Sequence, residues 1–225
     1  MCVSMSITFE PAGRFQPDLI NGHCSKAWRP GSLLSSWCCT KWGGTRKSFS
    51  VLRCGVRYDD TLYSPFRQQL ELLEDVKIYF EDNYEQINVL VPQFGGSDPA
   101  DIVHDFQRGL TAYHDMALDK CYVIDLNTTI VMPPHNLWEL LVNVKKGTYL
   151  PQTYIIQEEM IVTEHINDLE QLGSFIYRLC NGKETYRLKR RTARRRINRR
   201  EAGNCSHIRH FENTFVVETV ICKKS

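Results

Sequence analysis

The sequence contains no run of 18 apolar residues, and its first 30 residues lack the apolar core of a signal peptide. A membrane-spanning helix needs the first of these features, and a secretory leader needs the second. Taken literally, the sequence predicts a chain without a route into a membrane or a secretory compartment.

The motifs of familiar catalytic sites are also missing. The sequence has no glycine-rich phosphate loop, no HExxH, no G-x-S-x-G and no CxxC pair. The histidines His104, His114 and His135 are scattered singly. We expect them to be solvated or buried in a core, not to bind metal. The sequence therefore predicts a non-enzymatic protein with no metal ion and no other cofactor.

Cysteine, in contrast, is abundant. Nine cysteines are present, five of them within the first 54 residues, and the other four are widely spaced: Cys121, Cys180, Cys205 and Cys222. These four predict two disulfides and an oxidising compartment, with four buried free thiols as the alternative. The Asn-Thr-Thr sequon at residues 127–129 indicates the same luminal route, because glycosylation takes place there.

Positive charge is concentrated in one segment, RLKRRTARRRINRR at residues 187–200. It holds nine of the 28 basic residues and no acid, so the rest of the chain has 19 basic against 26 acidic residues. Residues 187–190 fit R-x-K-R, residues 196–199 fit R-x-x-R, and Arg199-Arg200 is a dibasic pair. An extended basic arm suits cleavage by a subtilisin-like proprotein convertase. We favour this interpretation over a nucleic-acid-binding or nuclear-import arm, because nucleic-acid-binding domains usually spread their charge over a folded face.

Regular structure is predicted from about residue 66 onward. Residues 66–75 begin helix-like, whereas DVKIYFED and QINVLVPQ have the composition of strands. The clearest helix start is Asp98-Pro99, an N-cap followed by a first-turn proline. Apolar residues then recur at helical spacing: Ile102, Val103, Phe106, Leu110 and Tyr113.

The remaining patterns predict a strand over 121–132, a helix over 136–147, a long strand or strand pair over 153–166, and a helix over 169–182. Together they predict an α+β domain with helices packed on a mostly antiparallel sheet.

Asp105 departs from this pattern, because it lies at the edge of the apolar stripe of the helix predicted from Asp98. A partly buried carboxylate there would make the packing of the helix sensitive to mildly acidic pH. The alternative is that Asp105 borders the core and faces water.

The last 25 residues predict a β-hairpin with a turn at Asn213-Thr214. Pairing around this turn places Cys205 opposite Cys222, Arg209 opposite Glu218, and Phe211 opposite Val216. The second strand, TFVVETVI, is β-prone and has a single charge, which is typical of segments that stack into fibrils. A two-stranded hairpin is marginally stable alone, so we expect the preceding domain to cover it.

Four segments resemble the integral membrane protein 2 (BRI) family. They are the stretch from DVKIYFED to TTIVMPP (residues 75–134), GTYLPQTYIIQEEMIVTEH, FIYRLCNGKETYRL and IRHFENTFVVETVIC. The resemblance covers roughly residues 52–225, and the part around 76–182 resembles a BRICHOS domain. It implies a stalk over 54–75, a BRICHOS domain over 76–182, a basic processing linker over 183–200 and a releasable peptide over 201–225. Residues 1–53 show no period of 2 or 3.6 and are expected to be irregular.

The resemblance also implies roles for individual residues. Cys121–Cys180 matches the BRICHOS disulfide, Cys205–Cys222 closes the peptide loop, and Cys54 matches a stalk cysteine that forms intermolecular disulfides in a relative. Asn127 falls on the glycan site, and Asp105 matches an aspartate linked to pH-dependent assembly. The cleavage site matches Arg199-Arg200-Glu201, with the cut after Arg200.

The family consists of type II membrane glycoproteins of the Golgi, plasma membrane and lysosome, with the C-terminal part luminal or extracellular. Its transmembrane helix is expected before Cys54, where residues 14–50 do not match. The implied partners are a furin-like convertase, the amyloid precursor protein and its amyloid-β peptide, together with a possible disulfide-linked homodimer and no nucleic acid.

Our leading hypothesis is a precursor whose BRICHOS domain chaperones β-prone segments and negatively regulates processing of the amyloid precursor protein. One alternative is a peptide precursor whose released hairpin is the active product. Another is a cytosolic arginine-rich protein that binds nucleic acid.

Overall fold

The computed structural model describes residues 38–41, 49–60, 68–90, 97–145, 155–191, 205–213 and 215–223. Within these ranges, eleven strands form one sheet in the order β1-β2-β3-β4-β5-β6-β7-β9-β8-β11-β10. The strands are β1 (Cys38–Lys41), β2 (Phe49–Asp60), β3 (Gln68–Tyr79), β4 (Tyr84–Val89), β5 (Ala100–Asp105), β6 (Leu110–Asp115), β7 (Lys120–Asp125), β8 (Ile155–His165), β9 (Glu184–Arg190), β10 (Cys205–Glu212) and β11 (Phe215–Cys222). The helices are α1 (Pro134–Lys145), the short 3-10 helix η1 (Glu170–Leu172) and α2 (Ser174–Cys180).

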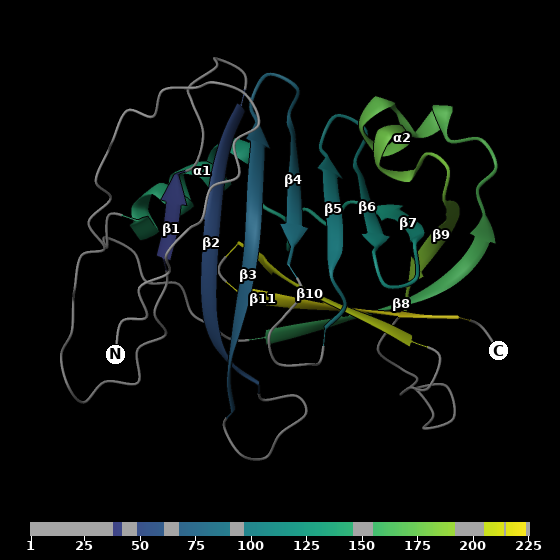
Figure 1. The fold of residues 1–225 in the computed structure, drawn as a ribbon. Coiled ribbons are helices and arrows are strands. Elements are labelled where there is room, and N and C mark those ends of the chain that lie inside the picture. Colours follow the sequence, from purple (N-terminus) through teal and green to yellow (C-terminus); the bar gives the residue numbers. More distant parts are fainter. Residues whose placement is uncertain are drawn as a thin grey trace, which may run out of the picture.

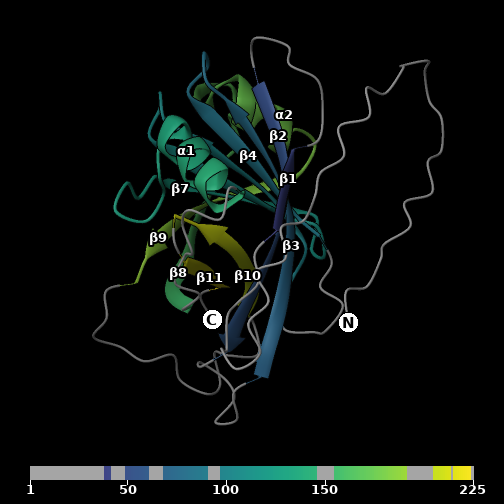
Figure 2. The same cartoon turned by 90° about the vertical axis from the view of Figure 1, so that its left-hand side faces the viewer.

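The sheet turns back on itself at its C-terminal end. Strands β2 to β7 run side by side, and β8, β10 and β11 cross behind them in the view of Figure 1. The turned view of Figure 2 shows the same three strands as a separate layer beside β3. As a result, β10 packs against β3 and β4, which lie far from it in the strand order.

Both faces of the central strands are covered. On one face, the larger core joins β2–β7 to α1 and the β10–β11 hairpin, through residues such as Leu52, Leu141 and Phe211. On the other face, α2 and η1 pack over β5–β7 and bury Ala112, Val123, Leu172 and Ile176 among others. A strand buried on both faces loses the alternation of polar and apolar residues that marks a half-buried strand.

This double burial explains the main error of the sequence analysis. The predicted helix after Asp98 is instead two antiparallel strands, β5 and β6, joined by a four-residue turn that ends in Gly109. Gly109 has φ +65°, a conformation that favours glycine. Three strands of six residues follow one another at a period of ten, and each ends in an aspartate: Asp105, Asp115 and Asp125.

Two further expectations are corrected. Within the helix-like start predicted at residues 66–75, residues 68–75 belong to β3, in which buried Leu72, Glu74 and Val76 alternate with more exposed neighbours. The predicted basic linker over 183–200 includes Glu184–Arg190, which form β9 between β7 and β8.

Several elements are confirmed. They include the strands at DVKIYFED and QINVLVPQ, one long strand at β8, and the helices α1 and α2. The strand predicted over 121–132 is present as β7 but ends at Asp125. The hairpin has the predicted register, with Cys205, Arg209 and Phe211 opposite Cys222, Glu218 and Val216. The fold is nevertheless sheet-dominated, with few helices among the described residues, so packing of helices on the sheet is not its main feature.

Candidate functional site

The candidate site is the interface between the C-terminal hairpin, β10–β11, and the rest of the sheet. Strand β11 pairs with β8 in parallel, and β10 is the last strand in the order. A disulfide joins Cys205 to Cys222 across the hairpin. All eight residues of β11 are buried, as are six of the eight in β10. The hairpin is therefore an integral part of the core.

The free edge of β10 is occupied by side chains and backbone from the preceding domain. The backbone N–H of His207 donates to Asp98 Oδ2 (3.2 Å), that of Arg209 to Ser97 Oγ (2.9 Å) and that of Phe211 to Glu74 Oε2 (3.0 Å). The Asp98 N–H also donates to the His207 carbonyl (2.6 Å). An uncapped edge strand is a template for pairing with another chain, and these contacts block the edge at every second residue.

A charged pair is buried between the hairpin strands. Arg209 Nε donates to Glu218 Oε1 (2.9 Å), and Arg209 Nη1 donates to the Tyr58 hydroxyl on β2 (2.9 Å). Gln157 on β8 donates to the other oxygen of Glu218 (2.9 Å). This network ties the hairpin to β2 and β8 and compensates the burial of both charges.

A second buried cluster combines carboxylates with histidines. Glu85 on β4, His104 on β5 and Thr111 on β6 lie in one cross-strand row, on the face that the hairpin covers. From β10, His210 and Glu212 project into the same region, where Glu212 Oε1 lies 2.8 Å from His104 Nε2 and 3.6 Å from His210 Nε2. Neither oxygen of Glu85 or of Glu212 has a hydrogen-bond partner among the described residues.

Burial dominates the electrostatics of this cluster. It raises the pKa of Glu74 to about 8, with smaller contributions from the nearby carboxylates Glu212 and Asp75 and an opposing one from the Phe211 N–H. Burial, Glu212 and Glu74 also raise the pKa of Glu85 well above its ordinary value. Burial and the neighbouring His104 lower the pKa of His210 to about 3. The interface therefore favours neutral forms of these groups.

Asp105 lies elsewhere, at the end of β5 and not on a helix. It is fully buried, which contradicts the alternative that it faces water. Its Oδ1 accepts hydrogen bonds from the backbone N–H groups of Gln107 and Arg108 (3.0 Å each), and Arg108 Nη1 lies 3.5 Å from Oδ2. Asp115 holds the next turn in the same way, through the N–H groups of residues 117 and 118. Both aspartates shape hairpin turns.

The structure places the remaining predicted residues as follows. Cys121 on β7 is bonded to Cys180 at the end of α2. Cys54 is fully buried on β2 and is itself disulfide-bonded. Asn127 follows β7, and its Nδ2 donates to Glu158 (3.2 Å). The cleavage residues Arg199, Arg200 and Glu201 lie outside the described residues.

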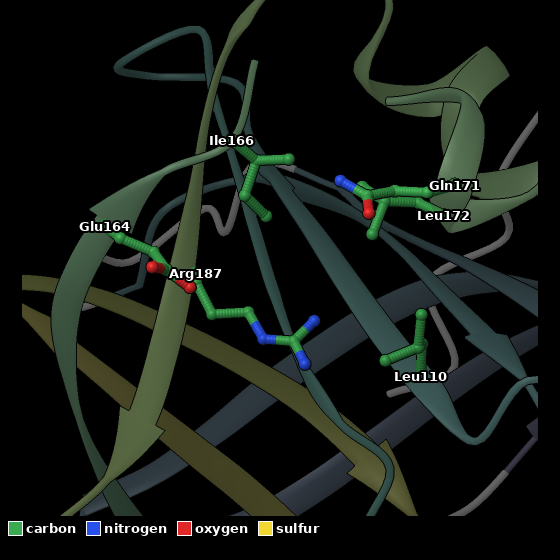
Figure 3. Close-up of a pocket in the computed structure, with 6 residues that line it drawn as sticks. All are labelled: Leu110, Glu164, Ile166, Gln171, Leu172 and Arg187. Atoms are coloured by element: carbon green, nitrogen blue, oxygen red, sulfur yellow. The ribbon is translucent and has the colours of Figure 1, made fainter. Parts of the chain in front are cut away.

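A shallow surface hollow of about 350 Å³ lies on the α2 side of the sheet (Figure 3). Leu110, Ile166 and Leu172 line it, and the Arg187 side chain extends into it. Arg187 also donates to Asp125 (3.3 Å). The lining shows no arrangement of a nucleophile and a base, so the hairpin interface remains the stronger candidate.

The sequence analysis missed most of this interface. Asp98 is the N-cap of the helix that the sequence predicts, and Glu74 lies in the segment with a helix-like start. His104 and His210 are 106 positions apart, and only the fold brings them together. One feature of the sequence could have indicated this interface, because the β-prone tail contains several charged or ionisable residues: Arg209, His210, Glu212 and Glu218. Such side chains require partners when they are buried.

Residues 96–187 match the BRICHOS domain family, so the chain contains a BRICHOS domain. Over 173 residues, or 77% of this chain, it is 76% identical to Integral membrane protein 2C of Homo sapiens and of Pongo abelii, and 77% identical to that of Rattus norvegicus. The chain belongs to the integral membrane protein 2 family.

The matched part spans 65% of the length of the human and orang-utan relatives and 64% of the rat relative. Among the described residues, no helix is both long enough and apolar enough to cross a membrane.

Proposed function

We propose that this protein is a non-enzymatic precursor whose BRICHOS domain keeps the C-terminal hairpin folded and unable to pair with other chains. The observation that supports this proposal best is the capping of His207, Arg209 and Phe211 along the outer edge of β10. The segment that the sequence marks as fibril-prone is β11, and it is enclosed between β8 and β10. The segment that the sequence marks as fibril-prone is thus buried along the whole of β11.

A furin-like convertase is the proposed agent of release, by cleavage after Arg200. The basic residues at the start of the arm already have acidic partners in the fold, since Arg187 binds Asp125 (3.3 Å) and Arg190 binds Glu158 (3.1 Å). These two arginines are thereby engaged within the sheet, which supports processing over binding of nucleic acid through the whole arm.

Departure of the hairpin would uncover the edge of β8, with which β11 pairs in parallel over seven residues. It would also uncover the apolar face formed by residues such as Leu52, Val76 and Ile87. An extended β-prone peptide can add to such an edge by backbone hydrogen bonding, with pockets for alternate side chains. We propose amyloid-β and the corresponding part of the amyloid precursor protein as such clients, whose binding restrains processing of the precursor.

The family membership supports a membrane setting, with the BRICHOS domain and hairpin on the luminal or extracellular side. We propose residence in the Golgi, plasma membrane and lysosome, and glycosylation at Asn127. A homodimer linked through Cys54 requires this buried cysteine to leave its present bond.

The test compares the intact chain, the convertase-nicked chain and the synthetic peptide 201–225 in an amyloid-β fibril assay. We expect the intact chain to be weakly active, the nicked chain to delay fibril formation once its peptide dissociates, and the peptide alone to assemble by itself. Activity of the peptide alone would favour the peptide-precursor alternative. If no form delays fibril formation, the chaperone proposal is wrong.

A parallel titration with a nucleic-acid duplex tests the remaining alternative. Steeply salt-dependent binding that is lost when the arginines of residues 187–200 become alanine would favour a nucleic-acid-binding arm.

A further inference from the structure

The geometry points to a transition-metal site, suited to Zn²⁺, that joins the BRICHOS domain to the C-terminal hairpin through His104, His210 and Glu212. One possible ligand atom from each residue lies within 4.8 Å of the others. All three side chains are at least 98% buried. The first ligand comes from β5 and the other two from β10.

The separations of the three ligand atoms are close to those in a metal site. Zinc binds imidazole nitrogen and carboxylate oxygen at 2.0–2.2 Å, which separates neighbouring ligands of a tetrahedral site by about 3.3 Å. The distances of 2.8 and 3.6 Å from Glu212 Oε1 to His104 and His210 bracket this value. Despite their proximity, His104 Nε2 and Glu212 Oε1 form no hydrogen bond.

The donor atoms of His104 and Glu212 are buried and have no hydrogen-bond partner within the described part of the chain. Neither oxygen of Glu212, nor Nε2 of His104, has a hydrogen-bond partner among the residues that the structure describes. A buried polar atom without a partner destabilises a fold, and a cation between these atoms removes that cost. Two nitrogens and one oxygen match the preferences of zinc, whereas calcium and magnesium prefer sites made of oxygen alone.

The surroundings support the same assignment. His104 Nδ1 lies 2.9 Å from Thr111 Oγ1. When Nδ1 carries the proton and donates to this hydroxyl, the lone pair of Nε2 faces Glu212, as in the hydrogen-bonded histidines that bind metals in proteins. Glu85 is opposite His104 in the sheet register and fully buried, and both of its carboxyl oxygens lack a hydrogen-bond partner among the described residues.

Such a site would make attachment of the hairpin to the BRICHOS domain depend on zinc. Because its ligands come from both sides of the interface, a bound ion would hold the hairpin on the domain even after the arm is cut. The inference does not depend on chaperone activity, so its test can succeed or fail separately from the proposed function.

The experiment uses the full oxidised chain with its free thiols alkylated, refolded with and without Zn²⁺. Bound zinc is counted by elemental analysis, and affinity is measured against a chelating dye. We expect about one equivalent per chain and a higher midpoint of thermal unfolding with zinc. The variants H104Q and E212Q should bind zinc at least tenfold more weakly, and T111V should show a smaller loss. The control H165A changes an exposed histidine that lies 2.8 Å from Asn167, and it should bind like the wild type.

Cobalt spectroscopy of the wild type keeps the test decisive if a variant fails to fold. Co²⁺ at this site should give visible ligand-field bands of a four- or five-coordinate centre without intense thiolate charge-transfer bands. Thiolate bands would place the metal on cysteines and overturn the assignment. Absence of bound zinc in the wild type, or unchanged affinity in folded H104Q and E212Q, would also overturn it.

Discussion

The carboxylate of Glu74 on β3 accepts a hydrogen bond of 3.0 Å from the backbone N–H of Phe211 on β10, 137 residues later in the chain. Glu74 is fully buried on the face that the hairpin covers. The domain therefore places an ionisable group against the edge of the segment that it protects, and the charge of this group links hairpin docking to pH.

Stability should fall as the pH rises through the range in which Glu74 ionises. Burial raises the pKa of Glu74 from its ordinary 4.5 to about 8, so between these values the folded protein keeps a proton that the unfolded chain releases. The stabilisation is complete below about pH 4.5 and is lost as the pH approaches 8. Glu74→Gln keeps an acceptor for Phe211 and removes the titration. At pH 8 we expect the free energy of unfolding in urea to be higher for Glu74→Gln than for the wild type, by a few kcal/mol in order of magnitude. Near pH 4.5 the two proteins should be equally stable.

Two comparisons isolate the effect of Glu74. Glu71→Gln changes an exposed carboxylate on the same strand and should leave the pH profile unchanged. His210 has the opposite effect on the stability of the protein. Because its pKa is lowered to about 3, its contribution to stability is lost as the pH falls below 6.5. Because His210 is present in the wild type and in the variant, its contribution cancels in their difference. That difference also reflects the carboxyl groups that interact with Glu74, namely Glu212, Asp75 and Glu85. Parallel profiles for the wild type and Glu74→Gln would contradict this prediction.

Local features of this fold can be predicted from the sequence, whereas its long-range contacts cannot. The hairpin register followed from charge, cysteine and apolar positions around Asn213, because a short turn fixes the pairing of its own strands. The region of β5 and β6 was mistaken for a helix because burial on both faces removes the period of two. The repeated Asp105, Asp115 and Asp125 marked the true strand ends. The contacts of Glu74 with Phe211 and of His104 with Glu212 depend on the folding back of the sheet, which no local pattern encodes.

Removing one edge cap should make the hairpin edge available to other chains. Ser97→Ala deletes the acceptor of the Arg209 N–H (2.9 Å), and we expect a loss of about 1 kcal/mol in the free energy of unfolding. Faster hydrogen exchange at the Arg209 amide and a shorter lag before aggregation should follow. Ser174→Ala, at an exposed serine that begins α2, is the matched control. If both variants aggregate at the wild-type rate, this cap does not protect the edge.

The buried and exposed arginine–carboxylate pairs should differ sharply in their effect on stability. Arg209→Ala leaves Glu218 buried without its guanidinium partner and should cost roughly 3–5 kcal/mol in urea unfolding. Arg53→Ala removes a pair with Asp75 of similar length, 2.7 Å, but Arg53 is 49% exposed, so we expect a loss below about 1 kcal/mol. The double variant Arg209→Met/Glu218→Leu should recover most of the first loss. Equal costs for the two single variants would show that burial does not control these pairs.

The disulfides Cys121–Cys180 and Cys205–Cys222 should contribute to stability according to the length of chain that each one closes. Cys121–Cys180 spans 59 residues and Cys205–Cys222 spans 17. The chain-entropy relation gives about 4 kcal/mol for the first and about 3 kcal/mol for the second. Replacing each pair by alanine and measuring chemical unfolding under oxidising conditions tests this order. A larger loss from the hairpin disulfide would indicate that it acts mainly on the folded state.

Convertase cleavage of the folded chain should avoid the R-x-K-R motif at residues 187–190. This motif lies in β9, where Arg190 Nε donates to Glu158 (3.1 Å), Arg190 Nη1 donates to the Asp125 carbonyl (2.8 Å), and the Arg191 N–H donates to the Glu159 carbonyl (2.8 Å). A protease needs an accessible extended segment, so cutting after Arg190 would require β9 to leave the sheet. We expect Arg190→Ala to leave peptide release unchanged and Arg200→Ala to abolish it, as measured by mass spectrometry of the released fragment. Chain unfolded in denaturant and returned briefly to assay conditions should be cut at both positions. A fragment that begins at Arg191 from folded protein would show that β9 opens readily and that the fold does not select the cleavage site.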